Sequence, residues 1–287
     1  MNTESDNLRL SFEFFPPKTD AGREKLIGVR KELNKFNPEF FSVTYGAGGS
    51  TRDNTVGIVT QMKSEGLNVA PHLSFGGDDE ESMLALLTQY KEAGIDRIVA
   101  LRGDMPSGVG GALQLVYANE LVAFIRKHFG AHFQLEVAAY PEIHPESESY
   151  SSDINYLKQK LDAGANSAIT QYFFNPDAYF YFIEQCDKAG ITKPIYPGII
   201  PVTNYKNLAR FSDACGAEIP RWIKKRLQDF GDDQASITAF GIELISELCE
   251  TLLDNGAPGL HFYTMNQIEP TRQILLNLGL NPGTEAH

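Results

Sequence analysis

The sequence contains few cysteines and no long apolar run. Its three cysteines, Cys186, Cys215 and Cys249, lie far apart without C-x-x-C spacing, which argues against a disulfide framework or a structural zinc site and favours a reducing, cytoplasmic environment. No apolar run reaches the ~18 residues that suggest a membrane span. The N-terminal residues MNTESDNLRL lack the basic and apolar regions of a secretory signal. We therefore expect a cytoplasmic protein that does not enter a membrane.

Positive charge is also scarce. The chain has 25 Lys and Arg residues against 37 Asp and Glu residues, a formal net charge of −12. A chain of this charge repels nucleic acids and anionic membranes as a whole. A phosphorylated ligand would need a local anion-binding feature, such as a helix N-terminus, a glycine-rich loop or one or two basic side chains.

Short apolar runs instead alternate with segments of helical period along the 287 residues. This pattern predicts eight strands, at residues 8–15, 40–45, 69–75, 97–102, 133–140, 167–174, 195–200 and 260–264. Amphipathic helices are expected between them, at residues 24–36, 51–65, 80–93, 117–129, 153–163 and 176–189. The phrases EAGID, DAGAN and KAGIT each end a predicted helix and lead into a strand, as three copies of one turn.

Eight strands alternating with helices over about 250 residues are typical of a (β/α)₈ barrel. An open doubly wound sheet is the alternative fold, but its glycine fingerprint is replaced after the first strand by Phe14-Phe15-Pro16-Pro17. Residues 204–258 are too long for one helix and predict extra helices between the seventh and eighth strands. Without a linker-like segment, we interpret residues 1–287 as one domain.

Polar residues gather at the predicted C-terminal strand ends, where barrel enzymes place their active sites. They are Glu13, Thr44, Tyr45, His72, Arg102, Asp104, Tyr140, Glu142, His144, Gln171 and Tyr263. Glu13 lies in the aromatic strand Phe12-Glu13-Phe14-Phe15, where burial would raise its pKa and suit it to general acid catalysis. The alternative is a barrel-lining glutamate paired with an arginine.

Two further phrases fit an anionic or heterocyclic ligand. In Leu101-Arg102-Gly103-Asp104, the arginine can hold a phosphate and the aspartate can accept two N–H groups from a ring; the alternative is a surface ion pair. The loop at residues 45–51 brings glycine backbone close to a ligand, or simply starts a helix.

Two other functions remain open on residue type alone. His72, His144, Glu13 and Asp104 are the residue types of a divalent-metal aldolase or hydrolase barrel. Neither His72 nor His144 has another histidine at H-x-H or H-x-x-x-H spacing, however. A non-enzymatic barrel that binds a small ligand is the third function, but such a protein has no need of a buried acid.

Taken together, the strand-end phrases resemble the 5,10-methylenetetrahydrofolate reductases of bacterial type, catalytic domain only. The phrases are SFEFFPPKT, FSVTYGAGGSTRD, APHLS, IVALRGD, VAAYPEIHPE, DAGANSAITQYFF, PGIIPV and HFYTMN. The resemblance runs from about residue 10 to about residue 278. It implies a barrel that binds FAD, takes hydride from NADH or NADPH and reduces methylenetetrahydrofolate to 5-methyltetrahydrofolate.

The resemblance also implies roles for individual residues. Glu13 is similar to the family's general acid, and Asp104 to the carboxylate between flavin and pterin. The positions similar to FAD contacts are Thr44, Tyr45, Ala47, His72, Arg102, Gly103, Asp104, Tyr117, Ala118, Tyr140, His144, Asp153 and Lys160. Gln171 is similar to a residue that contacts nicotinamide and folate, and Asn207 and Gln267 replace the Gln and Arg of other members at substrate positions.

One barrel mouth must then serve three small molecules. We expect nicotinamide and folate to take turns on one flavin face, which predicts ping-pong kinetics. No resident metal, nucleic acid or membrane partner is expected, and the interpretation includes association of the chain with copies of itself.

Overall fold

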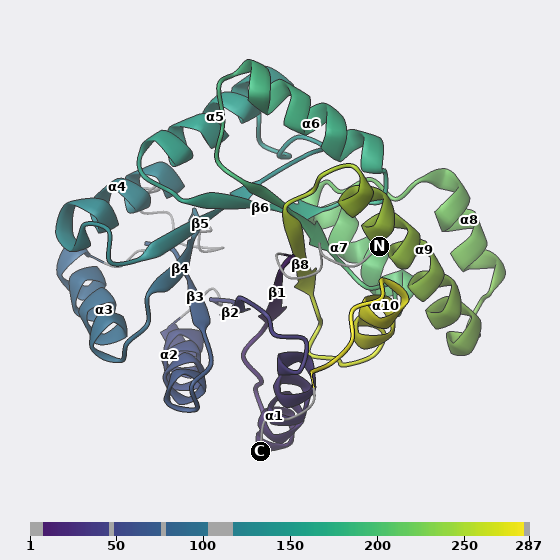
Figure 1. Cartoon of the computed structure of the whole chain (residues 1–287), viewed down its shortest axis with the longest axis horizontal. Coiled ribbons are helices and arrows are strands. Elements are labelled where there is room, and N and C mark those ends of the chain that lie inside the picture. The colour runs from purple at the N-terminus through teal and green to yellow at the C-terminus, as the bar shows by residue number, and fades with distance from the viewer. Residues whose placement is uncertain (1–7, 46–48, 76–78, 103–116, 284–287) are drawn as a thin grey trace.

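The computed structural model describes residues 8–45, 49–75, 79–102 and 117–283, and their strands close into a barrel (Figure 1). Within these residues, eight parallel strands pair in chain order, and β8 returns to β1. They are β1 Arg9–Phe14, β2 Phe40–Val43, β3 Val69–Leu73, β4 Arg97–Ala100, β5 Gln134–Ala139, β6 Ser167–Tyr172, β7 Ile195–Ile199 and β8 Gly259–Tyr263. Each overlaps a predicted strand, so the (β/α)₈ barrel is confirmed.

Helices surround the barrel (Figure 1). They are α1 Asp20–Asn34, α2 Gly49–Ser64, α3 Glu80–Glu92, α4 Ala118–Phe129, α5 Tyr150–Asp162, α6 Pro176–Lys188, α7 Tyr205–Cys215, α8 Arg221–Asp229, α9 Gln234–Asp254 and α10 Thr271–Asn277. The helices α7, α8 and α9 lie between β7 and β8, which confirms the extra helices predicted there. The short helix α10, which follows β8, was not expected from the sequence.

The three repeated glycine phrases form the same turn. Gly94, Gly164 and Gly190 have φ angles of 77°, 120° and 76°, in the region that favours glycine. The residue after each glycine donates its N–H to the carbonyl five residues earlier, as Ile95 does to Tyr90. This is the hydrogen bond of a Schellman motif, which ends a helix and releases the chain into the next strand.

The N-terminal end of the barrel interior holds an ionic cluster. The carboxylate of Glu136 is fully buried and pairs with Arg9, whose Nη2 lies 2.7 Å from Oε1, and with Arg97. Both arginines also pair with Glu39. Ser167 donates to Glu136. We call these five residues, Arg9, Glu39, Arg97, Glu136 and Ser167, the base cluster. Its two positive and two negative charges cancel.

A thin apolar layer lies above the base cluster. It consists of Phe40, Ala70, Val99 and Ile169, which form a separate buried group inside the barrel. The guanidinium of Arg97 lies 4.6 Å from the centre of the Phe40 ring, so the two layers are in direct contact. Inward-facing residues beyond this layer lie nearer the C-terminal ends of the strands. We call that end of the barrel the mouth.

Candidate active site

Glu13 lies near the C-terminal end of β1, between two histidines from other strands. Its Oε2 is 3.2 Å from Nε2 of His72 on β3 and 3.6 Å from Nε2 of His261 on β8. The Glu13 side chain retains 17% exposure, whereas that of His261 retains 1%. The carboxylate can thus reach a ligand at the mouth, while His261 lies beneath it.

The sequence-based expectation of a raised pKa for Glu13 is wrong. Burial is the largest influence and does raise it, but His72 first, and then His261, outweigh burial and lower the pKa to about 2. Because the pKa of Glu13 in the folded protein lies below the ordinary 4.5, its ionisation contributes to the stability of the fold, and this contribution is fully present above pH 4.5. The contribution is lost as the pH falls through about 2. Without a ligand, Glu13 is therefore an anion at neutral pH.

His261 and Ser11 were not identified from the sequence as site residues. They are directly opposite in the pairing of β1 with β8, and Ser11 Oγ lies 2.7 Å from His261 Nδ1. Side chains alternate between the two faces of a strand, so the sequence alone could have placed Ser11 on the same face of β1 as Glu13. The pairing itself joins residues 250 positions apart, which local pattern cannot reveal.

The segment after β8 holds the end of β1 in place. Thr264 donates its hydroxyl to the carbonyl of Glu13 at 2.7 Å. The side-chain amide of Asn266 accepts from the N–H of Phe15 and donates to its carbonyl, at 3.0 and 2.8 Å. Met265 and Asn266 both have a φ of 53°, an uncommon conformation for residues other than glycine. The backbone on either side of the Glu13 side chain is therefore fixed.

A second cluster lies where β4, β5 and α5 meet. Arg102 pairs with Glu146 at 2.5 Å. Asp153 accepts from the N–H of His144 at 3.0 Å, and the His144 ring contacts Tyr140 edge-on with centroids 4.5 Å apart. Burial, followed by the charge of Arg102, lowers the pKa of His144. The structure thus brings together five residues that were predicted as cofactor contacts: Arg102, Tyr140, His144, Asp153 and Lys160.

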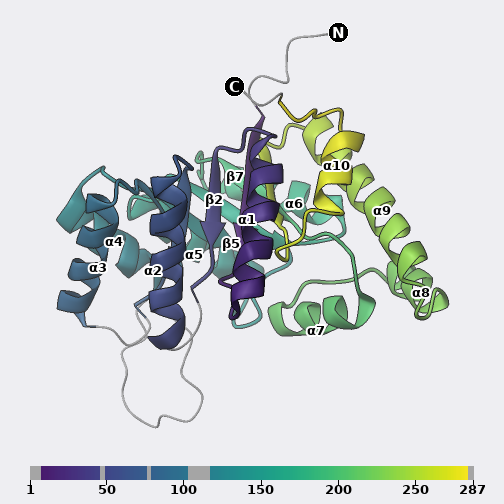
Figure 2. The same cartoon turned by 90° about the horizontal axis from the view of Figure 1, so that it is seen from below.

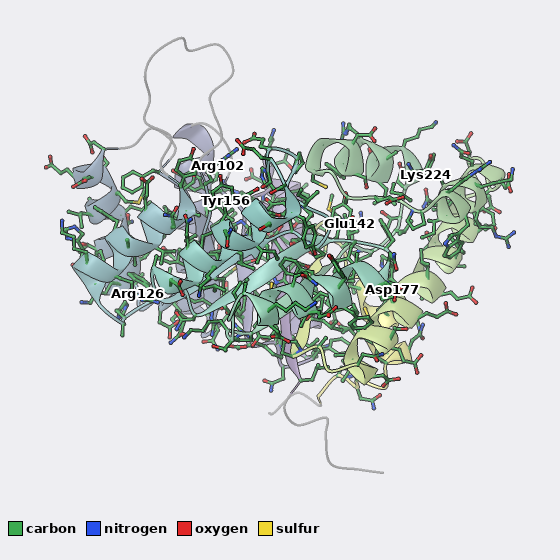
Figure 3. The ribbon with its side chains drawn as sticks, turned by 90° about the horizontal axis from the view of Figure 1, so that it is seen from above. Arg102, Arg126, Glu142, Tyr156, Asp177 and Lys224 are labelled. Carbon is green, nitrogen blue, oxygen red and sulfur yellow. The ribbon has the colours of Figure 1, made fainter. Side chains whose placement is uncertain are left out.

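Lys160 is the partly buried cation of this cluster. Its ammonium donates to the backbone carbonyl of Ala138 on β5. Burial lowers the pKa of Lys160 to about 8, although Asp153 opposes the shift. Arg102 lies toward the mouth in Figure 3, whereas Arg126, in the last turn of α4, lies toward the opposite end. Arg102 and Lys160 are therefore two cations of this cluster that are suited to an anionic ligand.

The remaining predicted residues are spread around the mouth. Thr44 follows β2, and its carbonyl accepts from Thr55 at 3.0 Å. Tyr45 is partly buried, Ala118 is buried, and Tyr117 is exposed at the start of α4. Gln171 lies on β6, Asn207 is exposed in the first turn of α7, and Gln267 follows β8. Ala47, Gly103 and Asp104 lie outside the described residues.

The histidines proposed for a metal site are not brought together. His72 faces Glu13, whereas His144 belongs to the cluster with Arg102 and Asp153. Within the described part of the chain, no group of three or more His, Cys, Asp or Glu side chains is arranged to hold a metal ion. The predicted set of His72, His144, Glu13 and Asp104 therefore gains no support from the structure.

Helix α7 lies at the mouth end of the molecule, to one side of the barrel (Figure 2), and its C-terminal end contacts the loop after β5. Glu142 accepts from the N–H of Glu218 at 2.8 Å. Gly216, with a φ of 75°, ends α7 so close to Pro145 that a Cβ would lie 2.8 Å from its ring. The loop that carries His144 and the helix that carries Asn207 are thus in direct contact.

Known proteins of similar sequence decide the family. A family model described as methylenetetrahydrofolate reductase matches residues 1–279. The chain belongs to the methylenetetrahydrofolate reductase family. It is 39% identical to the 5,10-methylenetetrahydrofolate reductase of Escherichia coli over 96% of this chain and 92% of that protein. It is also 39% identical to a probable methylenetetrahydrofolate reductase (NADH) of Oryza sativa over 94% of this chain, which spans 48% of the plant protein.

A solved structure of low sequence identity illustrates the similarity in fold. It is an uncharacterized protein from Clostridium thermocellum that binds two copies of 5-methyl-5,6,7,8-tetrahydrofolic acid. The TM-score is 0.65 with 17% identity, over 94% of each chain. At this identity the likeness supports the fold of the reductase alone. No helix in the described ranges is long and apolar enough to cross a membrane.

Proposed function

We propose that the chain reduces 5,10-methylenetetrahydrofolate to 5-methyltetrahydrofolate, with NADH or NADPH as the donor and non-covalently bound FAD as the carrier. When bound, FAD supplies hydride transfer between the nicotinamide and the folate. Membership of the reductase family supports the reaction. We also propose that the chain forms a single domain, associates with copies of itself and acts in the cytoplasm.

The observation that carries the proposal is the place of Glu13 at the mouth. A closed methylenetetrahydrofolate ring is a neutral aminal, which hydride cannot attack. Protonation of one aminal nitrogen opens the ring to an electrophilic iminium, so the site must deliver a proton. Glu13 is fixed through its backbone and partly exposed, and two imidazoles lie within 3.6 Å of its carboxylate. This arrangement can hold a proton and move it toward a ligand.

The second cluster fits the charge of FAD. A pyrophosphate needs cations, and the chain as a whole is acidic. Arg102 and Lys160 supply positive charge next to Tyr140 and His144. Lys160 is a partly buried cation that donates to the backbone carbonyl of Ala138, and a bound anion would stabilise its charged form. We assign the pyrophosphate to Arg102 and Lys160, and the general acid to Glu13.

Replacing Lys160 tests this assignment. A charge-assisted hydrogen bond contributes roughly 1.5–3 kcal/mol, so Lys160→Met should weaken FAD binding by about 10- to 100-fold. Bound anion raises the pKa of Lys160 above the ligand-free value of about 8. Binding therefore takes up a proton between the two values, and wild-type affinity should fall as the pH rises above 8. Recovery of flavin fluorescence on dilution of the holoprotein measures both effects.

Lys158 provides the matched control, because it lies on the same helix and pairs with Asp162 at 3.3 Å. Lys158→Met should retain the wild-type affinity and its pH dependence. Equal FAD affinity in the Lys160 and Lys158 variants would remove Lys160 from the cofactor site.

The shared flavin face predicts the kinetics. If oxidised nicotinamide leaves before folate binds, initial rates at several fixed folate concentrations give parallel double-reciprocal lines. Excess folate should then compete with NAD(P)H. The assay counts 5-methyltetrahydrofolate formed per nicotinamide oxidised, with an expected ratio of one. Converging lines would contradict the shared face, and no methylated product would contradict the function itself.

A further inference from the structure

Strand β6 is irregular where it reaches the mouth. Its parallel register with β7 shifts between Ile169 and Tyr172, and we call residues 169–172 the β6 bulge. The other seven strand pairs close the barrel without such a shift. Bulges of this kind re-aim a side chain and are frequent beside active sites. The side chain at this bulge is Gln171, the only residue of β6 that is not buried.

Two hydroxyl groups hold the β6 bulge. The hydroxyl of Thr170 accepts from the N–H of Gly198 on β7 at 2.9 Å. The hydroxyl of Tyr263 on β8 donates to the carbonyl of Thr170 at 2.7 Å. Burial, followed by the charge of Glu13, raises the pKa of Tyr263, so this hydroxyl keeps the proton that it donates. The backbone immediately before Gln171 is therefore fixed by a side chain from two strands away.

Gly198 leaves the space through which Tyr263 reaches β6. A Cβ added to Gly198 would lie 2.9 Å from the Tyr263 hydroxyl oxygen and 2.1 Å from the Thr170 carbonyl oxygen. Tyr263 thus crosses β7 at a point where β7 carries no side chain. The edge of its ring faces the rings of Tyr172 and His261, with centroids 6.4 and 5.2 Å away. The ring is therefore held from both sides while its hydroxyl supports the β6 bulge.

The side-chain amide of Gln171 has a defined orientation. Its Oε1 accepts from the N–H of Tyr172 at 3.0 Å. Because a backbone N–H can only donate, the atom that faces it must be the amide oxygen rather than the amide nitrogen. The amide nitrogen, with its two N–H groups, is then the part of the side chain left to meet a ligand. Gln171 therefore offers hydrogen-bond donors at the mouth end of β6.

We propose that Tyr263 and Thr170 are positioning residues, which hold the β6 bulge so that Gln171 presents its amide N–H groups to both ligands of the mouth. This inference rests on the proposed reductase function, in which nicotinamide and folate take turns. The carboxamide of nicotinamide and the pterin ring of folate each carry a carbonyl oxygen, which accepts from N–H. One donor of fixed orientation can thus serve both ligands without an ordering cost at each binding event.

Tyr263→Phe tests the proposal, because it removes the hydroxyl and keeps the ring beside Gly198. A displaced Gln171 weakens a contact made equally in the ground state and the transition state, so affinity changes and the limiting rate does not. We expect the apparent dissociation constants of NAD(P)H and methylenetetrahydrofolate each to rise about two- to tenfold, as for one neutral hydrogen bond. Rapid mixing of the holoprotein with each ligand over a range of concentrations separates affinity from limiting rate.

A double-mutant cycle distinguishes positioning from a direct effect of Tyr263. In Gln171→Ala the amide is absent, so adding Tyr263→Phe should weaken neither ligand further. Gln171→Glu keeps an oxygen for the N–H of Tyr172 but offers a carboxylate, which cannot donate, and it should weaken both ligands. Equal weakening by Tyr263→Phe with and without Gln171 would overturn the positioning role.

Tyr179→Phe is the matched control. The buried hydroxyl of Tyr179 also donates to a strand carbonyl, that of Ile195 at 2.8 Å, at the N-terminal end of β7. Its loss should lower stability as the loss of the Tyr263 hydroxyl does, but both dissociation constants should stay at the wild-type value. An equal rise in Tyr179→Phe would show that any lost tyrosine hydroxyl of the barrel has this effect, and would overturn the proposal.

Thr170 provides a second pair of variants. Thr170→Val removes the acceptor of the Gly198 N–H and should weaken both ligands, whereas Thr170→Ser keeps a hydroxyl and should restore the wild-type affinity. If Thr170→Val does not fold, Tyr263→Phe decides the question. Wild-type dissociation constants in Tyr263→Phe would overturn the positioning role alone, whereas a wild type that forms no 5-methyltetrahydrofolate would overturn the reductase function.

Discussion

Glu13→Gln should lose folate reduction and keep flavin reduction. Glutamine has the shape of the carboxyl group but cannot carry the proton, and general acid catalysis contributes roughly 10²- to 10⁴-fold. We therefore expect the rate of 5-methyltetrahydrofolate formation to fall by roughly 10²-fold or more. NAD(P)H oxidation with an artificial electron acceptor needs no proton on folate and should stay close to wild type. Rapid mixing of each half-reaction separately measures both.

Glu142→Gln is the control for this substitution. Glu142 is also a partly buried glutamate at the mouth, and it accepts one hydrogen bond from the N–H of Glu218 at 2.8 Å. A glutamine oxygen can accept the same bond, so both half-reactions should be preserved. A Glu13→Gln protein that lost both half-reactions equally would show that Glu13 supports the flavin site or the fold.

Gly198→Ala should destabilise the barrel more than the same substitution at a glycine whose added Cβ has open space around it. An added Cβ would lie 2.1 Å from the carbonyl oxygen of Thr170 and 2.7 Å from Cε2 of Tyr263. The oxygen belongs to the backbone, and the Tyr263 hydroxyl donates to that same carbonyl, so a shift of either neighbour disturbs this partly buried hydrogen bond. Overpacking costs about 1–3 kcal/mol, and we expect the upper end or beyond. Urea unfolding of the holoprotein measures this loss.

Gly57→Ala on α2 provides the comparison, because nothing lies within 4 Å of its added Cβ. Replacing a glycine in a helix by alanine should stabilise the protein by roughly 0.5–1 kcal/mol. A Gly198→Ala protein as stable as wild type would mean that β7 can move away from β6 and β8 without cost at this point.

The fold was predictable because its signals are local. The glycines of EAGID, DAGAN and KAGIT each end a helix within a few residues of the next strand, and the aromatic and β-branched runs between such turns are long enough to define strands. The helix α10 was missed because it is only seven residues long and begins after Pro270, without a side-chain cap. Short helices of this kind depend on packing, here against α9, which no local pattern records.

The site was only partly predictable. The placement of Glu13 at a strand end follows from a period of two and the barrel rule, and the sequence phrases lead to the same residue. The direction of its pKa does not follow, because it depends on His72 and His261, which reach Glu13 only when β3 and β8 take their places in the closed barrel. Burial was correctly foreseen as an influence, but the partners that reverse it were not.

The apolar layer between the base cluster and the mouth has a consequence for how the protein can change over evolutionary time. Phe40 separates Arg9 and Arg97 from His261, and the base cluster is neutral as a whole. Its charges therefore exert little field on Glu13. Lineages could exchange the ions at the base for another well-packed set and alter the melting behaviour of the barrel, while the acidity of its mouth and the reaction there stayed the same.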